Sequence, residues 1–100
     1  MPLFVYILYS DKLNKFYKGQ TNDLSDRLAR HNGGNELATE PGRPWLLMWS
    51  VEKANRSEAV VLESKIKNLS ADRLIKFMLK YEANVSSPDE LLLLKQLSGC

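Results

Sequence analysis

Residues 3–32 read LFVYILYSDKLNKFYKGQTNDLSDRLARHN, and this stretch decides the fold of the chain. Side chains alternate along residues 3–10, which are rich in β-branched and aromatic types, as is typical of a half-buried strand. Residues 11–14 (Asp-Lys-Leu-Asn) predict a turn. The stretch therefore begins with an antiparallel hairpin.

The hairpin brings two tyrosines to one face of the predicted sheet. With residues 11–14 as the loop, Tyr6 faces Gly19 and Leu8 faces Tyr17. Tyr6 and Tyr17 are then diagonal neighbours, about 7–8 Å apart at Cα, and Gly19 leaves room above the sheet. Tyrosine is common in strands, so packing is one explanation of the pair, and chemistry shared by two phenols is the other.

The same stretch ends in a predicted helix. It starts at Asn22, with Thr21 or Asn22 as its cap, and Asp23 in the first turn favours the helix dipole. Residues 32–34 (Asn-Gly-Gly) stop the helix. Its leucines mark the face that packs on the body of the protein.

Two polar side chains share that packed face. Residues 24, 27, 28 and 31 follow the i, i+3, i+4, i+7 spacing, so Arg27 and the only histidine, His31, lie beside two leucines. An unpaired inward charge is costly, so a buried partner, a cleft or a bound anion is expected to receive them. The alternative is that Arg27 reaches water at the edge of the stripe while His31 is a satisfied boundary residue.

Residues 45–53 predict a third strand. Strict alternation puts Trp45 and Trp49 on the same face, where both are expected to be packing residues rather than platforms for bases. Both faces of the strand are largely apolar. We therefore expect it at the centre of a small antiparallel sheet with helices on its faces.

A carboxylate interrupts the apolar stripe of the next helix, which is predicted over about residues 55–68 with Asn55 as a candidate cap. The stripe consists of Ala59, Leu62 and Ile66. Glu63 occupies the intervening position on the same face. An ordinary ion pair with Lys67, one turn later, explains this glutamate as well as a functional role does.

Composition restricts the classes of protein. One hundred residues with 44% hydrophobic and 26% charged side chains suit one domain with one modest core. A net charge of +2 permits a nucleic-acid partner without requiring one. The single cysteine, Cys100, cannot form an internal disulfide, although it could link two chains, and the N-terminal apolar run lacks a basic leader. We therefore expect a cytoplasmic protein.

The hairpin and the following helix resemble the GIY-YIG nuclease family. The match consists of Phe4-Val5-Tyr6, Tyr17-Lys18-Gly19, Arg27, His31 and Glu63. Phe4 stands where the family name has Gly, and Lys18 stands where it has Ile. The layout is most similar to the small stand-alone members, and it covers about residues 3–80.

This resemblance implies a fold of the α/β class, of α+β type, with a small three-stranded antiparallel sheet flanked by helices. It also implies metal-dependent hydrolysis of a phosphodiester bond. Glu63 would hold a single Mg²⁺ or Mn²⁺, and Arg27 would neutralise negative charge on the phosphate. Tyr6, Tyr17 and His31 would activate and position water, and which of them is the base stays open.

The implied partner is nucleic acid, with DNA favoured over RNA and repair intermediates among the possible substrates. Arg43, in the Gly- and Pro-rich loop of residues 33–44, and Lys67 are candidate backbone contacts, as is Thr39. The rival class is a non-catalytic module that keeps the fold and binds nucleic acid or protein. Its attraction is that the chain lacks the appended domains from which larger nucleases of this type gain target choice.

The resemblance divides the chain into a nuclease-like domain at residues 1–82 and a C-terminal extension at residues 83–100. Residues 88–97 predict a short helix that contains four consecutive leucines. Four exceed what one face of a short helix can bury, so the segment either packs back on the domain or contacts another chain. A homo-oligomer or a partner protein through residues 88–97 is the corresponding expectation.

Overall fold

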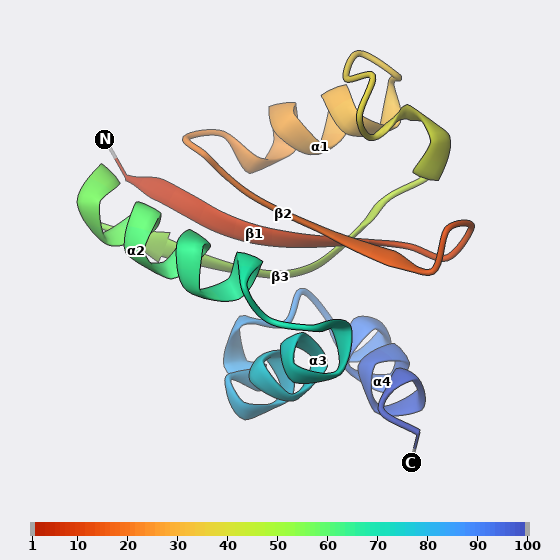
Figure 1. Ribbon diagram of the computed structural model, residues 1–100. Helices are drawn as coiled ribbons and strands as arrows, with labels where there is room; N and C mark the ends of the chain where they lie inside the picture. The colour runs from red at the N-terminus through yellow and green to blue at the C-terminus, as the bar shows by residue number, and fades with distance from the viewer. Residues whose placement is uncertain (1, 100) are drawn as a thin grey trace.

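The computed structural model describes residues 2–99 as a three-stranded antiparallel sheet with helices on both faces (Figure 1). The strands are β1 (Leu3–Ser10), β2 (Lys15–Thr21) and β3 (Leu46–Lys53), in the order β2-β1-β3. The helices are α1 (Leu24–Asn32) on one face and α2 (Arg56–Lys67), α3 (Ala71–Lys80) and α4 (Pro88–Leu97) on the other, with short 3₁₀ turns η1 (Glu40–Gly42) and η2 (Glu82–Asn84). The predicted fold class is confirmed.

The hairpin forms in the predicted register. Tyr6 pairs with Gly19 and Leu8 pairs with Tyr17 across β1 and β2. Asn14 closes the turn with a φ of 54°, a left-handed conformation that asparagine tolerates better than most residues. Its Oδ1 accepts a hydrogen bond of 2.8 Å from the hydroxyl of Tyr9. The turn is thus tied to the end of β1.

The predicted position of the third strand is wrong. β1 is the central strand, and β3 lies at an edge. The pairing of β3 with β1 also shifts between Ile7 and Leu8, because Met48 is an extra residue in a β-bulge. Since the bulge reverses the alternation, Trp45 packs on the α1 side of the sheet and Trp49 packs on the opposite side.

Part of the outer edge of β3 is covered, which explains its apolar character. Val85 forms an isolated antiparallel bridge with Trp49, and Ser86 N donates to the carbonyl of Met48 at 3.0 Å. The indole Nε1 of Trp49 donates to the carbonyl of Tyr81 at 3.1 Å. An edge strand protected in this way resembles a central strand in its sequence.

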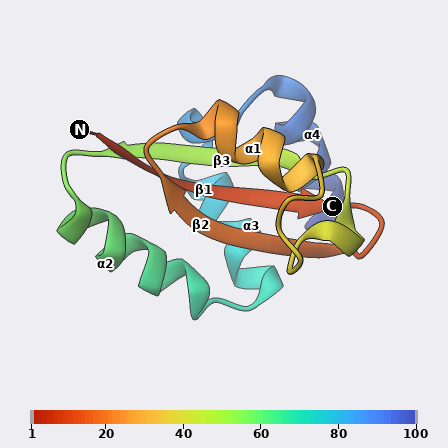
Figure 2. The ribbon, with the colours of Figure 1, turned by 90° about the horizontal axis from the view of Figure 1, so that it is seen from above.

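The alternation of β1 divides the buried side chains between two clusters. Val5, Ile7 and Tyr9 enter the main core, which α2, α3 and α4 complete. Tyr6 and Leu8 point to the α1 face. Viewed from above that face, α1 crosses over the strands while α2 runs beside β2 (Figure 2).

The C-terminal helix α4 packs back on the domain, against α3. Leu94 is completely buried in the main core, whereas Leu92 is 58% exposed. The segment therefore follows the first of the two predicted alternatives, and a contact with another chain stays a prediction. Cys100 lies outside the described residues. None of the helices in residues 2–99 is both long enough and apolar enough to cross a membrane.

The N-caps of α1 and α2 mark where both helices begin. Asp23, rather than Thr21 or Asn22, caps α1, because its Oδ1 accepts a hydrogen bond of 3.0 Å from the backbone N of Asp26. Thr21 supports this turn instead, by accepting from Asp23 N at 3.1 Å. Asn55 caps α2 as predicted.

Candidate active site

The α1 face of the sheet holds a chain of buried hydrogen bonds that begins at Tyr6. The Tyr6 hydroxyl lies 3.1 Å from His31 Nε2, and His31 Nδ1 lies 2.9 Å from Thr39 Oγ1. Tyr6, His31 and Thr39 are each no more than 2% exposed. The Thr39 hydroxyl also approaches the Glu36 carbonyl, at 3.4 Å.

These partners are compatible with proton positions that all run in one direction. When Thr39 donates to the Glu36 carbonyl, its oxygen is free to accept the Nδ1 proton of His31. Nε2 is then the unprotonated nitrogen and accepts the proton of the Tyr6 hydroxyl. The ring of His31 is thus oriented as a proton acceptor for Tyr6.

Burial and nearby charge keep this pair in its neutral form. Burial raises the pKa of Tyr6 to about 12; the phenol of Tyr17 and the carboxylate of Glu63 add to the rise, and Arg27 opposes it. Burial also lowers the pKa of His31, an effect that Arg27 reinforces and Glu36 opposes. At neutral pH, Tyr6 is therefore protonated and His31 is uncharged.

Tyr17 packs against both members of the pair. Its ring centroid lies 6.4 Å from that of Tyr6 and 5.0 Å from that of His31, the latter in an edge-on arrangement. Gly19 makes this packing possible, because a Cβ at this position would lie 2.7 Å from the Tyr6 hydroxyl oxygen. The register predicted the pair of Tyr6 and Tyr17, and the structure brings His31 of α1 to the same place.

Arg27 faces a cleft at the end of the sheet, hereafter the Arg27 cleft. This cleft has a volume of about 230 Å³ and is lined by Leu3, Gln20, Thr21, Asn22, Arg27 and Arg56. Two of these residues hold a polar atom, Arg27 Nε and Gln20 Oε1, that is buried without a hydrogen-bond partner among residues 2–99. Buried polar groups are normally paired, so each of these atoms is a candidate to bind a ligand.

Glu63 reaches the same region from α2. Its Oε1 accepts a hydrogen bond of 2.9 Å from Gln20 Nε2, and its Oε2 lies 3.4 Å from Lys67 Nζ. The ion pair with Lys67 exists, as the simpler explanation predicted, but the carboxylate is only 14% exposed and also faces β2. Gln20 thus joins the carboxylate of Glu63 to the Arg27 cleft.

The donor set suits a hard divalent ion better than zinc. No cluster of three or more His, Cys, Asp or Glu side chains in residues 2–99 is arranged to hold a metal. Glu63 and the unpartnered Gln20 Oε1 offer oxygen atoms only. Mg²⁺ and Mn²⁺ accept such ligands, and Mg²⁺ keeps several waters and completes its shell with substrate phosphate. The residues present therefore fit a single ion of this type.

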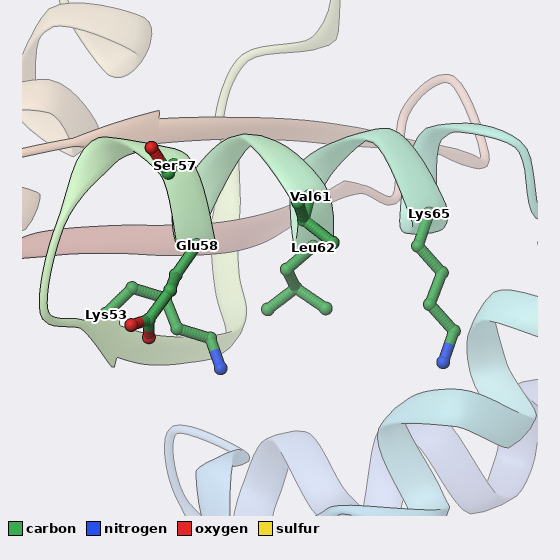
Figure 3. Close-up of a pocket in the computed structure, with 6 residues that line it drawn as sticks. All are labelled: Lys53, Ser57, Glu58, Val61, Leu62 and Lys65. Atoms are coloured by element: carbon green, nitrogen blue, oxygen red, sulfur yellow. The ribbon is translucent and has the colours of Figure 1, made fainter.

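The larger hollow, on the other side of α2, holds none of the predicted site residues. It has a volume of about 420 Å³ and is lined by Lys53, Ser57, Glu58, Val61, Leu62 and Lys65 (Figure 3). Val61 and Leu62 give it an apolar floor, and no predicted site residue borders it. Size alone does not identify the reactive site in this molecule.

The remaining predicted contacts lie apart from the cleft. Arg43 is held by Glu40, with Nε donating to the Glu40 carbonyl at 3.2 Å and the guanidinium 3.7 Å from the Glu40 carboxylate. Thr39, predicted as a backbone contact, is buried beneath His31 instead. The predicted contact of Thr39 with nucleic acid is therefore wrong, because the loop encloses its hydroxyl.

Sequence reasoning missed Gln20 and Arg56. A signal for Gln20 exists in the predicted register, which pairs this residue with Val5, a core position of the central strand. An amide paired with a core residue on a strand is unusual enough to suggest a specific partner. For Arg56 the sequence holds no comparable signal, because its place on the cleft depends on how α2 docks.

The comparisons agree with this geometry. The model of the GIY-YIG catalytic domain family matches residues 2–76, so the chain belongs to the GIY-YIG family, whose members are generally nucleases. A UPF0213 protein of Cronobacter sakazakii is 33% identical over 89 residues, which cover 85% of this chain and 93% of the relative. A UPF0213 protein of Staphylococcus haemolyticus is 33% identical over 76 residues, covering 75% and 92%.

A solved structure shows the same arrangement of elements. The solution NMR structure of a UPF0213 protein from Bacillus halodurans matches with a TM-score of 0.52 and 28% sequence identity. The match covers 90% of this chain and 92% of that one. The chain is thus similar in length and fold to small single-domain members of the family.

Proposed function

We propose that this protein is an endonuclease that depends on a divalent metal and hydrolyses phosphodiester bonds in nucleic acid, with DNA the favoured substrate. Membership of the GIY-YIG family supports the reaction class. One observation carries the proposal for this chain. Two residues that line the same cleft, Arg27 and Gln20, each hold a buried polar atom without a partner in residues 2–99, and the amide of Gln20 is bonded to Glu63.

The two unpartnered atoms suit ligands of opposite charge. Arg27 Nε is a charged donor, so it suits an anion such as a phosphate oxygen. Gln20 Oε1 is an acceptor beside a carboxylate, so it suits a cation. A phosphodiester together with its divalent ion supplies both, and either alone leaves one buried atom unpaired.

Glu63 is the residue that would hold the ion, with Gln20 Oε1 as a candidate second oxygen. When bound, Mg²⁺ or Mn²⁺ would supply positive charge that stabilises the phosphate oxygens and the leaving oxygen. Arg27 contributes from the other wall of the cleft by donating to a phosphate oxygen, where negative charge increases toward the transition state. These roles are electrostatic.

The tyrosines and His31 handle the proton of the attacking water. Tyr6 directs its own proton to His31 Nε2, which leaves an oxygen lone pair available to accept a hydrogen bond from water. Neutral His31 can receive the phenolic proton as Tyr6 takes one from water. Thr39 keeps the accepting nitrogen of His31 directed at Tyr6. Tyr17, packed against both rings, positions the water or the phosphate.

The test compares the parent with Glu63→Gln on labelled linear, nicked, flapped and branched DNA and on single-stranded RNA, with Mg²⁺ or Mn²⁺. We expect cleavage by the parent and none by the variant, because a neutral amide replaces the carboxylate that would hold the ion. Glu52→Gln is the matched control, since Glu52 is an exposed carboxylate on β3. It should cleave like the parent.

Circular dichroism of all three proteins establishes that each is folded. Metal-dependent cleavage retained by Glu63→Gln contradicts the assignment of the carboxylate. No product from any protein, with nucleic acid still bound in a salt-dependent way, favours a binding module instead.

A further inference from the structure

A second guanidinium lines the Arg27 cleft. Arg27 belongs to α1, whereas Arg56 belongs to the first turn of α2, in the helical layer on the other face of the sheet. The ion pairs among residues 2–99 are Arg30 with Asp26, Arg43 with Glu40 and Lys67 with Glu63. Neither cation of the cleft is therefore neutralised by a carboxylate in the described part of the chain.

The cleft is larger than a single small ion requires. One water needs about 10–15 Å³ of such space, so the volume of about 230 Å³ has room for a phosphate with its waters. Its other polar walls are Thr21 and Asn22 at the β2–α1 turn. Two like charges that face one space repel each other, and an anion between them removes that cost. Size and charge both suit a phosphate-bearing ligand.

Arg56 lies some distance along α2 from Glu63, beside which the proposed function puts the reacting phosphate. The two residues are seven positions apart on α2, which puts them on one side of the helix about 10 Å apart along its axis. Arg56 thus lies on the same side of α2 as Glu63, two turns closer to the N-terminal end of the helix. In Figure 1 this end of α2 lies at the same end of the sheet as the start of β1.

We infer that Arg56 binds the phosphodiester next to the one held at Arg27, so that a nucleic-acid strand crosses the cleft toward the N-terminal end of α2. The ligand class is the phosphate backbone of a polynucleotide, recognised by charge and without reading bases. The inference rests on the proposed function for the identity of the polymer. It requires binding at two adjacent phosphates but no cleavage.

The first test measures binding of a fluorescein-labelled DNA duplex in EDTA, by anisotropy over a series of salt concentrations. Arg56→Ala should weaken binding several-fold and reduce the salt slope by about 0.9, the value for one lost phosphate contact. Arg73→Ala is the matched control, because Arg73 is an exposed arginine on α3 and does not line the cleft. It should leave the slope unchanged, and Arg56→Lys should retain it. Equal slopes for Arg56→Ala and Arg73→Ala overturn the inference.

The second test is independent of polymer binding. Titration with thymidine 3′,5′-bisphosphate, which carries two phosphates, is followed by NMR of the arginine Nε–H signals. We expect the signals of Arg27 and Arg56 to shift together, with one dissociation constant. A shift of Arg27 alone, or of neither arginine, contradicts the inference.

The outcomes separate this inference from the proposed function. If Arg56→Ala reduces the salt slope but the parent cleaves nothing, the phosphate contact at Arg56 is supported and the proposed nuclease activity is contradicted. If Arg56→Ala retains metal-dependent cleavage with an unchanged KM, the nuclease activity is supported and the phosphate contact at Arg56 is contradicted. We expect Arg56→Ala to retain the fold of the parent, because alanine is the best helix former and Asn55 still caps α2.

Discussion

The two faces of the sheet differ in composition although β1 supplies both. On the face covered by α2, α3 and α4, the main core consists of apolar side chains together with Tyr9 and Trp49, whose polar atoms donate to Asn14 Oδ1 and to the Tyr81 carbonyl. On the α1 face, the buried apolar cluster has only Tyr6, Leu8 and Trp45, and the buried polar residues His31 and Thr39 lie beside it. One face is thus built mainly for stability and the other for precise placement of polar groups.

This difference shows how a chain of 100 residues combines a core with a cluster of buried polar groups. The larger apolar cluster stabilises the sheet by burial. That stability allows one end of the sheet to keep two unpartnered polar atoms, Arg27 Nε from the α1 side and Gln20 Oε1 from the α2 side. Substitutions on the two faces should therefore have opposite signatures in stability and in cleavage.

The largest effect is expected from Arg27→Ala, which sharpens the comparison from the α1 side. Cleavage should fall by about two to four decades, because the variant lacks the donor for charge on the phosphate. The free energy of unfolding should change little, since Arg27 Nε has no partner to lose. Single-turnover cleavage and urea unfolding measure the two quantities. Arg30→Ala, on the exposed side of α1, is the control, and near-parent cleavage by Arg27→Ala contradicts the role.

Leu74→Ala provides the opposite signature on the main core. Leu74 is completely buried, so its truncation should lower the free energy of unfolding by about 2–5 kcal/mol. Cleavage per folded molecule should remain at the parent's level, because Leu74 does not touch the α1 face. Leu92→Ala, at a leucine that is 58% exposed, should cost less than about 0.5 kcal/mol. A fall in cleavage beyond the loss of folded protein breaks the comparison.

The smallest effect concerns pH and the neutral His31. Its pKa is lowered in the folded state, so between that value and about 6.5 the unfolded chain binds more protons. The stability contributed by neutral His31 is therefore complete above about pH 6.5 and decreases as the pH falls, by at most about 1.4 kcal/mol per pH unit. Urea unfolding of the parent and His31→Gln at several pH values measures it. Identical pH dependence in the two proteins contradicts burial of a neutral ring.

The sequence sufficed for the hairpin and for part of the site, because both depend on local spacing. A four-residue turn sets the register of β2 on β1, which puts Tyr6 opposite Gly19 and beside Tyr17. The helical spacing of α1 then carries His31 onto the same face. Family resemblance supplied the proposed roles, and the structure supplied the contacts.

The parts that could not be predicted depend on contacts between distant segments. The bulge at Met48 is set by how β3 fits β1, and no local pattern marks it. The edge position of β3 was missed because Val85 covers it from a segment more than 30 residues later. The pairing of Gln20 with Glu63 likewise spans 43 positions and depends on the docking of α2.

The pairing of β1 with both of its neighbours has a consequence for folding kinetics. The β1–β2 hairpin closes through a four-residue turn, whereas Tyr6 meets Ser50 of β3 only after a much longer loop is closed. Contacts between distant segments form slowly, so we expect the hairpin and α1 to associate early and α2 to dock later. A newly made chain would then gather its tyrosines and His31 before it acquires the carboxylate of Glu63.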